Sequence, residues 1–432
     1  MSLTLDAKLT STGTRFRIFP QSRFLQAFKK PETIYVSPAP QAIKPGPADD
    51  RFYVLDAINK RPYDQRHGRV DPYSGPVRPL LKPGADGHFD HFDVESRDFL
   101  VATMYATVRR VLDIWEDYFG RTIEWHFNLD FERLELVPLI EWDNAHSGYG
   151  FLEFGYDRLR PGVPDHSKPH CENFDALAHE LGHSLIFAEI PTPPQPAQTT
   201  EYWGHHEAAG DLVAIVAALH SDRVVSHLLD SSRGNLFTPN VLNRIGDVSA
   251  SKEVRKAFND ERMSTVPEEE HELSKPLTGA LFDVFVEVFQ KELVKRGLIT
   301  QKLADRSNHG PDDDEDDPAI QAEFNEAYAG NKAGFQQALL EARDYLGTLL
   351  ARTWTGMSPY FFTYSALGRK LLSVDRHMGG QHQETIRSCF QWREIRLPKD
   401  SPPHRIRTLN GELGHCTTDT TKSRHRRGRR RA

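Results

Sequence analysis

The chain has 432 residues, 38% hydrophobic and 27% charged, with a formal net charge of -7. This modest acidic charge does not favour nucleic acid as the main partner, and apolar runs such as Leu212 to Leu219 are too short to span a bilayer. Three cysteines without CxxC spacing argue against a disulfide framework and a cysteine zinc site.

The N-terminus has no basic region followed by an apolar stretch, so no secretory signal is visible. We therefore expect a cytoplasmic protein by default, and export by a route without a cleavable signal stays open. The length allows two or three domains' worth of core.

Residues 1–50 are rich in proline and poor in periodicity, which predicts an extended arm with one or two short strands, such as Thr33–Val36. Residues 51–172 predict a β-rich N-terminal lobe with one long helix. The predicted helix covers 95–118, and the predicted strands cover 51–55, 124–129, 134–140 and 150–154.

The segment from Phe174 to Phe187 contains His179-Glu180-x-x-His183 in an apolar setting that favours a helix. Residues four apart share a helix face, so both imidazoles can reach one metal ion. Glu180 projects beside them, where a carboxylate can hold a water molecule. Asp175 is a candidate N-cap of this helix.

A proline-rich loop at 191–196 precedes a second predicted helix over 202–220. A zinc site of this kind needs a third protein ligand and an open position. Glu207 and Asp211 share a face of the second helix, and small residues between them allow close approach to the metal. Asp211 can accept a hydrogen bond from a ligand imidazole. The competing interpretations are an exposed helix start, or His205 or His206 as the third ligand.

Further helices are predicted over 276–296, over 319–354 with a break near Gly330, and over 363–378. Residues 173–398 thus predict a mainly helical lobe that contains the metal site. We interpret the acidic run 311–318 as a solvated loop rather than a calcium site. Residues 399–432 predict a disordered basic tail, solvated rather than bound to nucleic acid beyond weak contact.

These residues resemble the thermolysin-like metallopeptidases, of the gluzincin type. In that family the H-E-x-x-H helix is followed by a helix with a Glu ligand and an Asp four residues later. The resemblance implies zinc, one per chain, on His179, His183 and Glu207, with Glu180 as general base and Asp211 behind the ligands. The metzincin pattern does not fit, since its third His falls at Glu189.

The resemblance extends to both sides of the motif. His271-Glu272-Leu273-Ser274 is similar to the family's H-x-x-S, whose His stabilises the oxyanion. Asn144-Ala145 is similar to the family's edge strand, which binds the substrate backbone. The resemblance also implies substrate contacts for Arg244 and Tyr202.

Some positions depart from the family pattern. The family's Asp that orients the oxyanion His falls at Val266 here, so Glu268, Glu269 or Glu270 has to replace it. Asp175 matches one carboxylate of the family's calcium site, but Ala218 stands where a Glu is expected, so we do not expect bound calcium.

The resemblance implies an α+β, zincin-type metallopeptidase fold with the H-E-x-x-H helix between a β-rich N-terminal and a mainly helical C-terminal region. It also implies a zinc-dependent endopeptidase that acts on peptide or protein substrates, with no membrane partner. The alternative is a catalytically silent or non-proteolytic zinc protein of the same fold that acts as a binding module.

Overall fold

Helix α2 (Arg97–Phe119) is the longest element of the N-terminal half, and the segments before it pack along its sides. The computed structural model describes residues 4–64, 69–238, 240–245, 255–257, 259–308 and 317–397. The predicted acidic loop and basic tail lie outside these residues, apart from the two residues at the end of the acidic run.

The first 50 residues contain the strand predicted over Thr33–Val36, but also a helix and a second strand in place of an extended arm. They contain helix α1 (Leu5–Thr12), strand β1 (Thr14–Ile18), the short helix η1 (Gln26–Phe28) and strand β2 (Glu32–Val36), with β1 and β2 antiparallel. Phe16, Ile18, Phe28 and Val36 are almost fully buried in the main core. The prolines hid this structure because they lie in the connections rather than in the elements.

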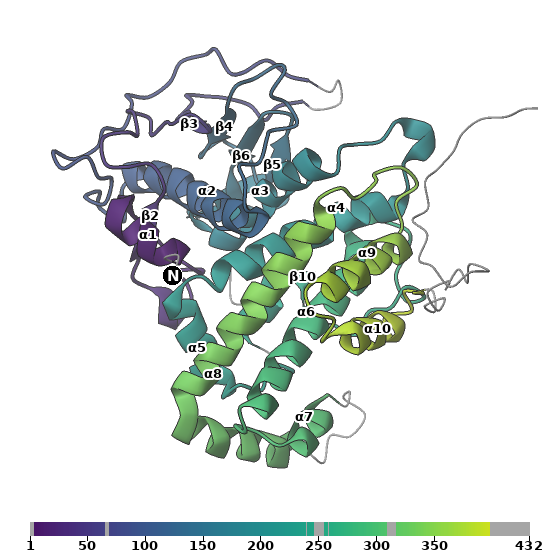
Figure 1. The fold of residues 1–432 in the computed structure, drawn as a ribbon. Helices are drawn as coiled ribbons and strands as arrows, with labels where there is room; N and C mark the ends of the chain where they lie inside the picture. The colour runs from purple at the N-terminus through teal and green to yellow at the C-terminus, as the bar shows by residue number, and fades with distance from the viewer. Residues whose placement is uncertain are drawn as a thin grey trace, which may run out of the picture. The chain divides into compact units, whose positions relative to one another are not determined.

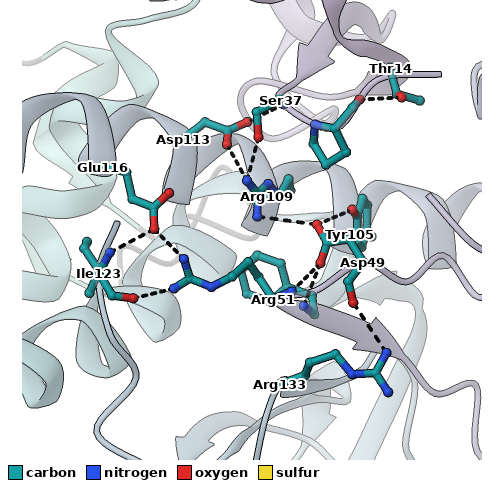
Figure 2. Close-up of polar contacts among 12 residues, drawn as sticks. Thr14, Ser37, Asp49, Arg51, Tyr105, Arg109, Asp113, Glu116, Ile123 and Arg133 are labelled. Atoms are coloured by element: carbon teal, nitrogen blue, oxygen red, sulfur yellow. Dashed lines mark hydrogen bonds and ion pairs between the residues drawn. The ribbon is translucent and has the colours of Figure 1, made fainter. Parts of the chain in front are cut away.

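Buried charged side chains on α2 also hold the N-terminal segment against this helix. Arg109 lies 3.1 Å from Asp113 and 3.4 Å from Asp49, and the hydroxyl of Tyr105 donates to Asp49 at 2.7 Å (Figure 2). Buried ions require partners, and the segment around Ser37 and Asp49 supplies them to α2. The segment 37–52 is therefore part of the folded body.

A four-stranded sheet contacts the helix that contains His179 and His183 through its strand β5. Its order is β3 (Phe52–Val54), β4 (Leu134–Val137), β6 (Phe151–Phe154) and β5 (Ala145–Gly148). The first three strands are parallel, while β5 is antiparallel to β6 and forms one edge. A hairpin of β7 (Tyr156–Arg160) and β8 (Val163–Pro169) follows, and the short helix η3 (His170–Glu172) connects it to the helical half of the chain.

The strand predicted over 124–129 is absent. Its amide groups bond locally, with Asn128 N–H donating to Trp125 and Phe131 N–H to Phe127. The segment is a turn whose apolar side chains, Trp125 and Phe127, point into the core. Burial on one side of a turn gave the same alternation as a strand.

The second half of the chain is helical (Figure 1). Its main helices are α3 (Phe174–Glu189), α4 (Thr200–Ala218), α5 (Asp222–Ser232), α6 (Glu270–Lys295), α7 (Gln301–Ser307), α8 (Asp317–Trp354), α9 (Tyr364–His377) and α10 (Gln383–Trp392). Short elements are η4 (Gln195–Ala197), η5 (Val241–Asn243) and the pair β9 (Arg244–Ile245) and β10 (Arg255–Lys256). The predicted break in α8 lies at Asn331. The fold is mixed α+β, as predicted.

Helix α4 contacts both α3 and α6, and α6 in turn contacts α8 and α10. One hydrophobic core includes side chains from all of these helices and from α2. Residues 1–397 form one compact unit, and the boundary predicted at 172/173 stays a prediction. In the described part of the chain no single helix is long and apolar enough to cross a bilayer. Helices α4 and α5 together reach the required length and apolar composition, but the chain bends by 94° between them.

Candidate metal centre

Two glycines allow α3 and α4 to cross closely. A Cβ atom on Gly182 of α3 would lie 2.8 Å from the Cα of Gly210 on α4, and a Cβ on Gly210 would lie 2.6 Å from Nδ1 of His179. Contacts this short exclude any side chain at either position without displacement. The sequence predicted close approach through small residues, and the structure shows that Gly210 faces His179.

The crossing brings the three predicted ligands together. Nε2 of His179 lies 3.5 Å from Oε2 of Glu207, and Nε2 of His183 lies 3.6 Å from Oε1 of Glu207. The imidazole rings are perpendicular, with centroids 4.8 Å apart. One ligand atom from each residue lies within 4.8 Å of the others, so the group could hold a metal ion.

This donor set fits zinc. Ligand atoms about 2.0–2.1 Å from a tetrahedral zinc ion are about 3.3–3.4 Å apart, close to the separations between Glu207 and each histidine. Two imidazoles and one carboxylate leave a fourth position for water, which is the arrangement of catalytic rather than structural zinc sites.

Asp211 lies behind the ligands, one turn after Glu207. Its Oδ1 is 3.0 Å from Nδ1 of His179, and its Oδ2 accepts from Thr278 of α6 at 3.5 Å. Asp211 is almost fully buried. A buried carboxylate beside Nδ1 favours the tautomer that presents Nε2 to a metal.

The start of α3 differs from the prediction. The N-cap is Asn173, whose side chain accepts from the N–H groups of Asp175 and Ala176. Asp175 is already inside the helix, and its carboxylate accepts from Gln21 of the N-terminal segment at 2.8 Å. Asp175 therefore connects α3 to the segment before β2.

The site opens into a cavity of about 1090 Å³. Glu180 lines this cavity beside the two histidines, on α3. Other parts of the wall come from β5, from the first turns of α4 and α6, and from the loop at Pro191 and Thr192. Such a volume has room for several residues of a peptide.

His271 lies in the first turn of α6, which begins six residues before the predicted start at Pro276. Its Nε2 is 3.9 Å from Oε2 of Glu207, and its Nδ1 is 2.6 Å from Oε1 of Glu269. Of the three glutamates predicted to lie beside His271, Glu269 therefore has its carboxylate within hydrogen-bond distance of the ring. The hydrogen bond from His271 holds the pKa of Glu269 below its usual value.

Asn144 and Ala145 lie where β5 begins, and both line the cavity. Because β5 is an edge strand, the side of its backbone away from β6 is free of the sheet. Behind it, Nε2 of His146 lies 2.6 Å from Oε1 of the buried Glu153, which also pairs with Lys60. These contacts fix the edge strand on the sheet.

Two other predicted residues are placed differently. Tyr202 is fully buried, and its hydroxyl donates to the carbonyl of Ile190 at 3.0 Å, so it does not face the cavity as a substrate contact requires. The neighbouring Trp203 lines the cavity instead. Arg244 begins β9, where the structure describes the backbone alone, so its role stays a prediction.

The competing third ligands do not join the metal group. His205 is buried, and its Nε2 accepts from the indole N–H of Trp354 at 3.0 Å. Burial lowers the pKa of His205 to about 3. His206 lies against Phe187, with ring centroids 4.3 Å apart.

Several cavity residues were not among the predicted site residues and lie in no predicted motif, among them His126, His170 and Trp203. His126 lies in the turn that was predicted as a strand, and His170 lies in η3, just before α3. No motif contains these residues, because three or more separate segments of the chain form this part of the wall. Only the tertiary structure brings them together.

Neither a scan of protein-family models nor a search of curated proteins found a match. Among solved structures, the precursor of protealysin, a metalloproteinase from Serratia proteamaculans, is similar with a TM-score of 0.33 and 12% identity. The similarity covers 65% of this chain and 86% of that one. A similarity at this level establishes neither a common fold nor a common activity.

Proposed function

We propose that this chain is a zinc-dependent endopeptidase of the thermolysin-like gluzincin type. The observation that supports this best is the group His179, His183 and Glu207, at zinc-like separations in a cavity that also contains Glu180. A structural zinc site would be closed on all sides. An open cavity beside a general base favours hydrolysis.

Zinc bound to the three ligands would polarise a carbonyl group and lower the pKa of water. Glu180 accepts the proton of the attacking water and then donates it to the leaving amine. His271 points Nε2 toward the site and donates to the carbonyl oxygen as negative charge develops there. Glu269 holds the opposite nitrogen of His271 and fixes its orientation.

The substrate backbone binds along the free edge of β5. A peptide in extended form adds a strand there through main-chain hydrogen bonds, which do not depend on its sequence. The edge begins at Asn144 and Ala145, both in the cavity wall. This arrangement suits an internal segment of a peptide chain, and therefore an endopeptidase.

The proposal is tested by metal analysis followed by mass spectrometry of a digested peptide library, with and without a chelator. We expect about one zinc per chain and cleavage that stops when zinc is removed and returns when it is restored. Absence of zinc in protein purified without added metal would exclude the site. One zinc per chain without cleavage of any peptide would instead support the binding-module alternative.

A further inference from the structure

Aromatic rings gather at one end of the metal cavity. Phe187 lies one turn after His183 on α3, and Trp203 lies one turn before Glu207 on α4, so each shares a face with a ligand. One turn of helix is about 5.4 Å. The rings are therefore within reach of a side chain next to the scissile bond.

Five rings, which we name the aromatic box, form this end of the cavity: His126, Tyr149, Phe187, Trp203 and His206. Phe187 is in the middle, with centroid distances of 4.3 Å to His206, 5.2 Å to His126 and 6.4 Å to Trp203. Tyr149 lies 5.3 Å from His126. The spacings are those of interacting aromatic pairs.

The box continues the edge of β5. Tyr149 follows directly after Gly148, the last residue of β5, and its hydroxyl donates to Asp130 at 2.7 Å, which fixes the ring. A peptide paired with β5 therefore reaches the box at the end of the strand. The backbone path and the rings belong to one continuous surface.

His206 points to a ligand. It is almost fully buried, it lines the cavity, and neither of its ring nitrogens has a hydrogen-bond partner among the described residues. Nδ1 of His126 likewise has no partner in the described part of the chain. A buried polar group left unpaired is unfavourable, so these nitrogens fit a polar group of the substrate, such as its backbone, that enters beside the aromatic side chain.

The rest of the cavity is different in character. Near the start of α6 it is lined by Glu270, Glu272 and Lys275, and near the start of α3 by Asp175. Burial lowers the pKa of His126 to about 4, so this ring adds no charge to the box at neutral pH. Uncharged rings in one part of the lining and charged groups in another distinguish apolar from polar substrate positions.

We propose that the aromatic box selects substrates by taking an aromatic side chain next to the scissile bond. This inference depends on the proposed endopeptidase function, and it adds the class of side chain that is recognised. The rings offer both faces and edges to an incoming ring, which favours an aromatic group over an aliphatic one of equal size.

The test measures binding without cleavage. Zinc-loaded Glu180→Gln protein is titrated by calorimetry with blocked hexa-alanine peptides that carry one phenylalanine at successive positions, and with the matching cyclohexylalanine peptides. We expect phenylalanine at one position to bind at least about 10-fold more tightly than alanine. The peptide with cyclohexylalanine at that position should bind at least about 3-fold more weakly than the phenylalanine peptide.

Variants locate the effect. Phe187→Leu and Trp203→Leu keep an apolar side chain but remove a ring, so each should reduce the ratio of phenylalanine to alanine affinity. Lys275→Ala, which removes a charged side chain of the cavity lining that is not part of the aromatic box, is the matched control and should keep the full preference. Equal binding of phenylalanine and cyclohexylalanine, or an unchanged preference in both ring variants, would overturn the inference.

The outcomes separate this inference from the function it depends on. If the wild-type protein cleaves peptides without any aromatic preference, the proposed selectivity of the aromatic box is wrong, while the endopeptidase proposal is unaffected. Protein that binds aromatic peptides through the box but cleaves none of them contradicts the peptidase proposal and supports the box.

Discussion

Nδ1 of His271 lies 2.6 Å from Oε1 of Glu269, and Oε2 of the same carboxylate accepts from the backbone N–H of Glu272 at 3.1 Å. Glu269 thus has two functions, because it caps α6 and orients His271. The carboxylate comes from two residues before the histidine, rather than from position 266.

The two functions of Glu269 are separable by substitution. Glu269→Ser keeps a good N-cap but is too short to reach His271. We expect kcat to fall about 10-fold, as when a partner behind an active-site histidine is removed, with unchanged zinc content and thermal stability. Glu268→Ser, at the exposed neighbouring position, is the control, and an equal loss in both variants would contradict the role of Glu269.

Glu180 is expected to be needed for chemistry and not for metal. Glu180→Gln should keep one zinc per chain and lose about 10²- to 10⁴-fold in kcat/KM, because glutamine cannot take a proton from water. His179→Ala should lose both zinc and activity. Zinc analysis and peptide hydrolysis on the same preparations check this, and cleavage by Glu180→Gln at the wild-type rate would refute the mechanism.

Gly210 is expected to be essential for the metal group. Gly210→Ala would place a Cβ 2.6 Å from Nδ1 of His179, so it should destabilise the fold by about 1–3 kcal/mol and weaken zinc binding. Gly330→Ala is the matched control, since a Cβ there meets nothing within 4 Å. It should be neutral or stabilising by up to about 1 kcal/mol. Thermal unfolding and zinc titration of both variants test the contrast.

Buried neutral histidines should make the fold sensitive to acid. Burial lowers the pKa of His205 to about 3, from an ordinary 6.5. Below pH 6.5 the unfolded chain therefore takes up a proton that the folded chain does not, and stability falls as the pH drops toward 3. One such group changes the free energy of unfolding by about 1.4 kcal/mol per pH unit in this range.

His205→Gln isolates this contribution. Glutamine can still accept from Trp354, but it does not titrate. Denaturant unfolding between pH 4 and pH 6 should show a pH slope for the variant that is smaller than the wild-type slope by about 1.4 kcal/mol per pH unit. Identical slopes would show that His205 is protonated in the folded protein.

Local sequence predicted the elements whose residues alternate with a fixed period. Helices α2, α4 and α9 agree with the predicted ranges to within about two residues, and the break in α8 lies one residue from Gly330. The strand predicted over 124–129 was wrong, because burial on one side of a turn imitates the alternation of a strand. Helices α5, α7 and α10 were not predicted at all.

The metal group was predictable because its spacing is local. His179 and His183 are one helical turn apart, as are Glu207 and Asp211, so each pair shares a face before any tertiary structure exists. That α3 and α4 then cross at Gly182 and Gly210 depends on the fit of two helix surfaces. The sequence offered small residues there and nothing more specific.

The rest of the site belongs to the tertiary structure. Tyr202 and Trp203 are adjacent in sequence, yet one packs in the core and the other faces the cavity, and periodicity alone does not say which. The aromatic box combines a turn, the end of β5, α3 and α4. The sequence determined which residues share a helix face, because helical geometry fixes that locally, and only long-range packing decided which of those faces meet around one cavity.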